Sequence, residues 1–277
     1  MTLHTVSSST KPDPRSKAGV QQSSLHSSAN GAQTPSSSPS QPSTFPTLTP
    51  SQIQAKIDAS TADLSIMFNH PRIAAAYMDD WHAKASVDKV PNDAPEGVAT
   101  VEKGCRDLRL RKVARFYHVE SDYYDWTLQR RMLRLVAPST AHLCKSVIME
   151  NTHFTQTDPT NSKYYCVIVQ YVSKLNTQKL INFVYGMNQN KPDRKLSKKD
   201  FNLRVADESM TMEITGHTQN GVSPIGMKVQ LPIILSGGVT ILQPPVFYMG
   251  GGHIDWKLAL PVHEFIHATK CFVVDTS

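Results

Sequence analysis

Three short apolar runs near the C-terminus constrain the fold most. They occupy residues 231–235, 246–249 and 256–260. Segments that contain glycine or proline separate these runs. Apolar runs of this length between such breaks are typical of buried strands and are too short for most helices. The C-terminal third of the chain is therefore expected to contribute several strands to one core.

Earlier in the chain, predicted strands are mixed with predicted helices. Strand-like patterns occupy residues 113–119, 144–149, 164–171 and 210–215. Apolar residues at helical spacing predict helices at 126–136, 179–187, 197–205 (with Ser197 as N-cap) and 261–268. Strands that cluster late, with helices between the early ones, favour an α+β domain over a doubly wound parallel fold. We expect a single mixed sheet with surrounding helices.

The first 50 residues have a different composition, dominated by Ser, Thr, Pro and Gln. Such a segment cannot bury enough apolar surface to offset its chain entropy, so a disordered tail is expected. The chain contains no apolar run of membrane-spanning length and no secretory signal, so no membrane association is expected. A basic, serine-rich start leaves mitochondrial import open. Its prolines and its lack of helical periodicity favour a cytoplasmic protein.

Residues 51–105 are predicted to form a helical extension followed by a linker. Helices are expected from Ser51 onward and over residues 73–85, separated at Pro71. Residues 86–105 carry two prolines and two glycines, which indicates a linker. The helical pair either docks on the main domain or binds another protein. The main domain is then expected at residues 106–277.

Cysteine and charge patterns limit the chemistry. The four cysteines form no CxxC pair and no zinc-like spacing with histidine, so buried free thiols are expected, with no metal and no cofactor. The formal net charge of +6 permits an acidic partner such as RNA. One basic cluster spans residues 106–115. A second contains Lys191, Arg194, Lys195, Lys198 and Lys199. From charge alone, both clusters are also explained as solvent-exposed loops or helix faces that bind no partner.

Two glycine-rich segments are candidate ligand sites. Residues 216–226 contain three glycines and Pro224, a composition that predicts a rigid loop with N–H groups able to hold a phosphate or an oxyanion. Gly250, Gly251 and Gly252 directly follow the apolar run 246–249. Close passage of a ligand or of a second backbone explains such glycines. A tight structural turn in the first case, and a flexible turn in the second, remain alternatives.

Lys145 lies within an otherwise apolar predicted strand. If its face of the sheet meets solvent, the lysine protects a sheet edge. If the face meets a cleft, the lysine is a positioned cation for a phosphate or a carbonyl group. Strand periodicity does not distinguish the two.

In their order along the chain, these segments resemble the YbaK/EbsC family, the prolyl-tRNA synthetase-associated editing domain. The resemblance covers about 150 residues. It rests on Lys145-Ser146-Val147-Ile148, Thr215-Gly216, Gly221 to Gly226 with Lys228, Leu231-Pro232, and Met249 to Gly252. The segments 123–126 and 149–152 are similar to a eukaryote-like branch of that family.

The resemblance implies an α+β editing domain that hydrolyses the ester between a wrong amino acid and tRNA, typically alanine or cysteine on tRNA for proline. It makes Lys145 the catalytic residue, a cation that orients the substrate. The backbone of residues 220–224 would hold the ester carbonyl, and water or a substrate group would be the nucleophile. The implied substrate-binding residues are Gly216, His217, Asn220, Gly221, Val222, Ser223, Pro224, Gly226, Gly250, Gly251 and Gly252.

The implied partners are the acceptor end of tRNA and an aminoacyl-tRNA synthetase or a multi-synthetase complex. The second basic cluster, together with Lys228, would contact RNA. One position departs from the family pattern, because Asn220 stands where glycine or alanine is expected. This leaves the amino acid specificity open. It also keeps a non-catalytic tRNA- or synthetase-binding module on the same fold as the alternative function.

Overall fold

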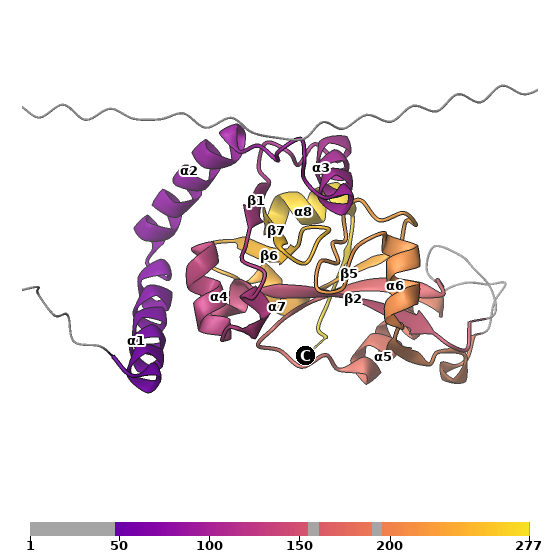
Figure 1. Ribbon diagram of the computed structural model, residues 1–277. Helices are drawn as coiled ribbons and strands as arrows, with labels where there is room; N and C mark the ends of the chain where they lie inside the picture. The colour runs from indigo at the N-terminus through magenta and orange to yellow at the C-terminus, as the bar shows by residue number, and fades with distance from the viewer. Residues whose placement is uncertain (1–47, 155–160, 190–195, 277) are drawn as a thin grey trace, which may run out of the picture. The chain divides into compact units, whose positions relative to one another are not determined.

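The computed structural model describes residues 48–154, 161–189 and 196–276, and their strands form two sheets (Figure 1). The smaller sheet is antiparallel, in the order β1 (Arg115–His118), β7 (Trp256–Pro261) and β6 (Val246–Gly250). The larger sheet has the order β4 (Leu203–Val205), β2 (Cys144–Asn151), β3 (Tyr164–Gln170), β5 (Ile233–Ser236) and β8 (Phe272–Val274). The predicted disordered tail falls almost entirely outside the described residues.

The two sheets are joined by one parallel bridge between Leu143 and Tyr248. In the larger sheet β2 pairs antiparallel with β3 and β4, whereas β5 pairs parallel with β3 on one side and β8 on the other. The predicted α+β class with mixed strand pairing is therefore confirmed. The strands that were expected in a single sheet are divided between two sheets that meet at the bridge.

Most predicted elements form within two residues of their expected limits. Three of the predicted helices are α4 (Leu128–Leu135), α5 (Thr177–Asn188) and α8 (Val262–Thr269). Shorter elements complete this part of the fold. They are η1 (Tyr123–Asp125), η2 (Thr140–His142) and α7 (Gly237–Thr240). The predicted strands became β1, β2, β3, β5, β6 and β7, with the single exception of residues 210–215.

Two elements differ from the sequence prediction. Residues 210–215 belong to a helix, α6 (Glu208–Thr215), which ends at Gly216 with a left-handed φ of 74°. A glycine in that conformation is a common helix stop, and its effect outweighs the apparent alternation. Residues 197–205 are not a helix. They form one turn, η3 (Lys198–Asp200), and then β4, which pairs with the edge of β2 and buries Leu203.

A third difference from the prediction lies in the expected linker, where the helix α3 (Glu96–Asp107) forms. Val98, Val101 and Cys105 are fully buried and belong to the main core, so this part of the segment is structural. Its glycines permit close packing rather than flexibility. A Cβ atom on Gly104 would lie 2.9 Å from the Gly226 nitrogen, so the helix backbone packs directly on the glycine-rich loop.

The predicted helical pair is present as α1 (Pro50–Phe68) and α2 (Pro71–Val87). Of the two expected roles, docking on the domain is observed for α2. Trp81 is 1% exposed, and its indole N–H donates to the Val113 carbonyl at 2.9 Å. The Tyr77 and Tyr248 hydroxyls are 2.7 Å apart. In contrast, α1 buries only Thr61.

The four cysteines are free thiols, as predicted, and three of them are buried. In the part of the chain that the structure describes, no helix is both long and apolar enough to cross a membrane.

Candidate functional site

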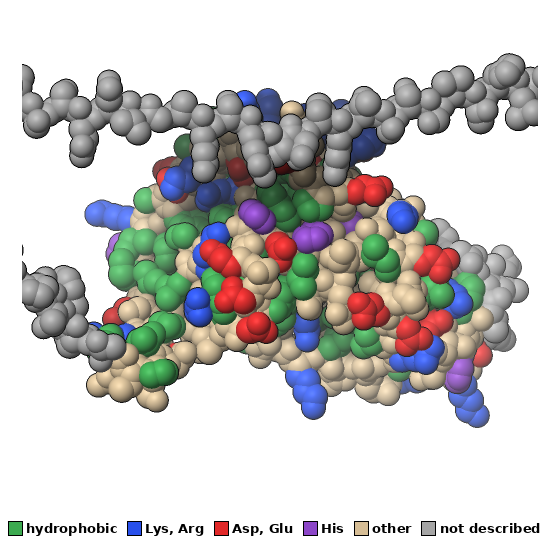
Figure 2. Space-filling view, viewed as in Figure 1, with side chains coloured by type: hydrophobic (Ala, Val, Ile, Leu, Met, Phe, Trp, Pro, Cys, Tyr) green, Lys and Arg blue, Asp and Glu red, His purple; other side chains and the backbone are tan. Residues whose placement is uncertain are grey.

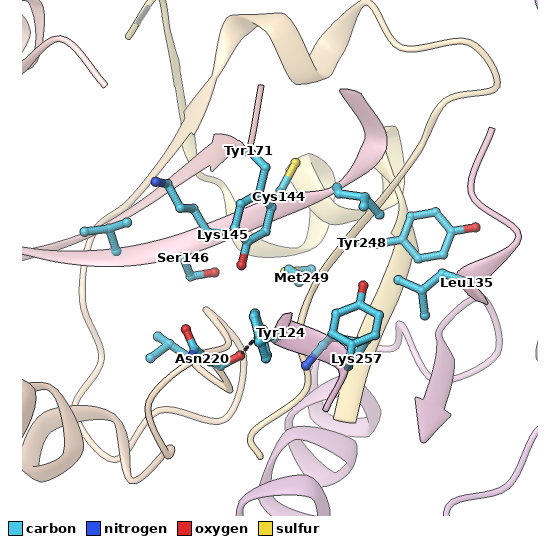
Figure 3. Close-up of a pocket in the computed structure, with 15 residues that line it drawn as sticks. Tyr124, Leu135, Cys144, Lys145, Ser146, Tyr171, Asn220, Tyr248, Met249 and Lys257 are labelled. Atoms are coloured by element: carbon cyan, nitrogen blue, oxygen red, sulfur yellow. Dashed lines mark hydrogen bonds between the residues drawn. The ribbon is translucent and has the colours of Figure 1, made fainter. Parts of the chain in front are cut away.

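A cavity of about 330 Å³ lies where the two sheets meet (Figure 3). It is bounded by β2, by β6 and β7, by η1, and by the loop that follows α6. Its lining residues are Tyr123, Tyr124, Leu135, Leu143, Cys144, Lys145, Ser146, Val147, Tyr171, Asn220, Val222, Tyr248, Met249, Gly250 and Lys257. The volume is within the range of small-molecule sites in proteins.

Lys145 is the second residue of β2 and lies at the cavity, as the sequence allowed. Its side chain is exposed, while Cys144 before it is buried. The Lys145 ammonium lies 5.8 Å from the centre of the Tyr171 ring. Among the described residues no carboxylate forms an ion pair with it, so its charge is available to a ligand.

A second lysine, Lys257, reaches the same cavity from β7. It is only 4% exposed, and its amino group donates to the backbone carbonyls of Ile254 and Trp256. Burial lowers the pKa of Lys257 to about 7. Figure 3 shows its nitrogen beside the ring of Tyr124.

Tyr124 connects η1 to the loop after α6. Its hydroxyl donates to the Asn220 carbonyl at 2.6 Å, the bond drawn in Figure 3. Asn220 has a φ of 60°, a left-handed conformation that asparagine tolerates better than most residues. This conformation explains physically why asparagine or glycine suits this position better than alanine. Arg131 donates to the Tyr124 carbonyl and stacks over its ring at 4.9 Å.

The loop at residues 220–224 uses some of its N–H groups internally. Gly221 donates to the Thr218 carbonyl at 2.9 Å, and Ser223 donates to His217 Nδ1 at 3.2 Å. Among the described residues, nothing accepts a hydrogen bond from the N–H of Val222, which lines the cavity. Val222 therefore supplies one backbone donor of this loop that has no acceptor among the described residues.

The glycines near the cavity bring protein segments together. A Cβ atom on Gly250 would lie 2.3 Å from the Val222 carbonyl oxygen, and one on Gly221 would lie 2.5 Å from the His253 carbonyl carbon. The end of β6 and the loop after α6 therefore touch backbone to backbone. The close approach predicted from the glycines occurs, and the partner is a second stretch of main chain.

Other predicted binding residues lie outside the cavity lining. His217 is 1% exposed and supports the loop through Ser223. Pro224 and Gly226 line a separate cavity of about 360 Å³ against α3. The remaining predicted positions that do not line the site cavity are Gly216, Gly221, Ser223, Gly251 and Gly252. Their roles in substrate binding stay predictions.

The predicted RNA contacts are spread over the surface. The side chain of Lys228 packs across Gly216, and Lys198 and Lys199 are on η3. Lys191, Arg194 and Lys195 lie outside the described residues. On the face that Figure 2 shows, Lys and Arg side chains are scattered among Asp and Glu. RNA binding by these residues stays a prediction.

Sequence reasoning missed Lys257 and the tyrosines at the cavity. Lys257 has the signal that identified Lys145, a lysine within an apolar strand, so it could have been singled out by the same rule. Tyr171 and Tyr248 carried no comparable signal, because they and the adjacent pair Tyr123 and Tyr124 come from three separate segments that only the folded chain brings together.

Replacing Gly252 with alanine is expected to destabilise the protein by about 2–5 kcal/mol. Gly252 has a φ of 94°, and an added Cβ would lie 2.2 Å from the Gly97 carbonyl oxygen. Urea denaturation measures the change in the free energy of unfolding. The matched control is Gly186→Ala on α5, where no atom lies within 4 Å of the new Cβ and a stabilisation of about 0.5–1 kcal/mol is expected. Equal effects of the two changes would contradict the close contact between Gly252 and Gly97.

No protein-family model and no curated protein matches the sequence. Solved structures do match its fold. One, described as a proposed trans-editing enzyme for prolyl-tRNA synthetase, aligns with a TM-score of 0.52 and 16% identity over 66% of this chain and 98% of its own. Another comes from computational grafting of epitopes onto scaffold proteins, with a TM-score of 0.51 and 15% identity over 66% of this chain and 98% of its own.

At these identities the likeness shows the fold. The chain contains an α+β domain of the type found in the trans-editing structure, and its candidate site is the cavity with Lys145 and Lys257 at the junction of the two sheets.

Proposed function

We propose that residues 106–277 form a YbaK/EbsC-type editing domain and that the protein hydrolyses the ester of mischarged aminoacyl-tRNA. One observation carries the proposal. An exposed lysine without an ion pair among the described residues and a backbone N–H without a partner lie at one cavity, on a fold shared with a proposed trans-editing enzyme. Alanine or cysteine on tRNA for proline is the proposed substrate class.

The chemistry of the cavity fits ester hydrolysis. The Lys145 ammonium binds a phosphate of the terminal nucleotide or the ester carbonyl and orients it. The Val222 N–H donates to the carbonyl oxygen as negative charge develops on it, which is the task of an oxyanion hole. Water or the ribose 2′-hydroxyl attacks the carbonyl carbon. The cavity lining supplies no protein nucleophile in this scheme.

Such an activity meets a physical need in translation. A binding pocket gains only about 1–3 kcal/mol of discrimination from one methylene group, so small amino acids are misactivated by a synthetase for a larger one. A second, hydrolytic site removes these errors. The proposed partners are accordingly the acceptor end of tRNA and an aminoacyl-tRNA synthetase or multi-synthetase complex, and the proposed location is the cytoplasm.

Replacing Lys145 with alanine is expected to lower the deacylation rate by about 10²- to 10³-fold, because it removes a positioned charge at the reacting group. The measurement follows the loss of labelled amino acid from mischarged tRNAs for proline and alanine. The matched control is Lys163→Ala. Lys163 precedes β3, pairs with Glu150 at 3.7 Å, and does not line the cavity. Absence of deacylation of every tRNA by the wild-type protein would refute the proposed activity.

A non-catalytic tRNA- or synthetase-binding module is the second candidate. It is favoured by α1, on which Ile53, Ile66 and Met67 are exposed by 46%, 70% and 51%. This function predicts a complex with tRNA or with a synthetase that forms equally well with wild-type protein and Lys145→Ala. It also predicts that charged substitutions at these three positions weaken synthetase binding and leave the fold intact.

A further inference from the structure

Lys257 is buried in the wall of the candidate site without a carboxylate partner. Its nitrogen lies 5.1 Å from the centre of the Tyr123 ring and 4.6 Å from that of Tyr124, and both tyrosines are on η1. Among the described residues, no Asp or Glu lies within ion-pair distance of it. A lysine this deeply buried is rarely kept for packing alone, since burial of an unpaired ammonium is costly.

The groups around Lys257 affect its charge in opposite directions. Burial is the largest influence, and with the nearby Arg131 guanidinium on α4 it lowers the pKa of Lys257 to about 7. Asp255 in the preceding turn acts in the opposite direction. The faces of the Tyr123 and Tyr124 rings also favour the charged form. Near neutral pH both forms of the amine are therefore populated.

The hydrogen bonds of Lys257 suit the neutral amine. Its nitrogen donates to two backbone carbonyls, those of Ile254 and Trp256. A neutral amine has two N–H bonds and one lone pair, so these two acceptors use both donors. The lone pair is then left for the cavity that Lys257 lines. An ammonium in the same place would carry a third N–H. In the described structure this N–H would face the rings of Tyr123 and Tyr124 or the cavity.

We propose that Lys257 is a catalytic residue of the candidate site and acts as the general base and then the general acid in aminoacyl ester hydrolysis. This inference rests on the proposed function and adds a proton-transfer residue to it. Lys145 and Lys257 then have different tasks. The exposed Lys145 contributes a fixed charge, whereas the buried Lys257 changes its protonation state during the reaction.

The proposed step is balanced in protons and electron pairs. The Lys257 lone pair takes a proton from the attacking water as the water oxygen bonds to the ester carbonyl carbon, and the carbonyl becomes an oxyanion. The oxyanion then collapses and breaks the carbon–oxygen bond to the ribose. The departing ribose oxygen takes the proton back from the Lys257 ammonium. The products are the free amino acid and a tRNA with an intact terminal hydroxyl, and the amine is regenerated.

The test compares the full-length wild-type protein with Lys257→Met, which keeps the length of the side chain, and Lys257→Arg, which fixes a positive charge. Deacylation is measured from pH 5.5 to 8.5 on the tRNA that the wild type deacylates fastest, with spontaneous hydrolysis subtracted. Wild-type kcat/KM is expected to rise about tenfold per pH unit below 7 and to level off above it. Both variants are expected to lose 10²- to 10⁴-fold in kcat and to lack that rise. Lys145→Ala is expected to keep it at a lower level.

A second readout does not depend on activity. With ¹³C-labelled lysine, one side-chain NMR signal should titrate near pH 7, and this signal should be absent in Lys257→Met. A Lys257 signal that titrates at the ordinary lysine value, or a Lys257→Arg variant that keeps wild-type kcat, overturns the inference while deacylation itself stands. If the wild type deacylates no tRNA, the proposed function and the catalytic role both fall, whatever the titration gives.

Discussion

Lowering the pH from 7 to 4 is expected to destabilise the fold by roughly 6 kcal/mol through two buried histidines, His142 and His217. His142 is 2% exposed and His217 is 1% exposed. Burial lowers the pKa of each to about 4 from an ordinary value of 6.5. Small domains are stable by only about 5–15 kcal/mol, so this change removes a large share of the free energy of unfolding.

The direction in which pH changes the free energy of unfolding follows from the number of protons that the native and unfolded states bind. Between pH 6.5 and 4 the unfolded chain binds a proton at each of these two histidines, while the native protein does not. The unfolded state therefore binds more protons, and the free energy of unfolding falls as the pH falls. Each histidine contributes about 3 kcal/mol over this window, because a pKa difference of one unit corresponds to about 1.4 kcal/mol.

Protonation of the two histidines also affects the hydrogen bonds around them. His142 Nε2 donates to the Pro244 carbonyl at 3.0 Å, so Nδ1 accepts from the Ser139 hydroxyl at 2.8 Å. His217 Nδ1 accepts from the Ser223 N–H at 3.2 Å. Protonation of Nδ1 on His217 would place two donors against each other. The loop that carries Val222 is therefore expected to loosen in acid.

Urea denaturation at pH 7.0, 5.5 and 4.5 measures this effect. The double substitution His142→Gln with His217→Gln should lower stability at pH 7 and remove most of the acid dependence between pH 6.5 and 4.5. His263→Gln on the exposed face of α8 is the control and should keep the wild-type slope. A wild-type slope in the double variant would assign acid sensitivity to other groups.

Local sequence patterns predicted the helices and strands whose formation depends mainly on their own residues. The prediction of strands at β6 and β7 was correct because a buried strand needs apolar side chains whichever strands it pairs with. Residues 210–215 were assigned wrongly because six residues of mixed pattern suit a strand or a helix. The helix stop at Gly216 was the better guide. The division into two sheets depends on long-range pairing, which local patterns do not encode.

The sequence likewise predicted one part of the candidate site and not the rest. Lys145 was identified because a lysine in an apolar strand is unusual, and the cavity at its face is what makes it a candidate. Periodicity could not place that cavity. Lys257 comes from a strand of the other sheet, more than a hundred residues away in sequence. The two sheets meet at the bridge between Leu143 and Tyr248, and there the fold brings both lysines to one cavity.

Replacing Trp81 with alanine is expected to lower the free energy of unfolding of the whole domain by about 3–5 kcal/mol. The Trp81 side chain packs in a core cluster with residues of α4, β6 and β7, and its ring meets that of Tyr248 edge-on at 6.1 Å. The change leaves a cavity at this position. It also removes the donor that satisfies the Val113 carbonyl, and an unsatisfied buried polar group adds to the loss.

This measurement decides whether α2 is part of the domain or an attachment to it. Because Tyr248 lies on β6 and also lines the candidate site, we expect one cooperative unfolding transition in which α2 and both sheets melt together. Circular dichroism and tryptophan fluorescence should then give coincident urea curves, each shifted to lower urea in Trp81→Ala. The control is Ile66→Ala on α1, a residue 70% exposed, for which a change below about 0.5 kcal/mol is expected. A separate early transition for the helices, with the main transition unmoved by Trp81→Ala, would make residues 50–87 an independent module and return them to the role of a partner-binding extension.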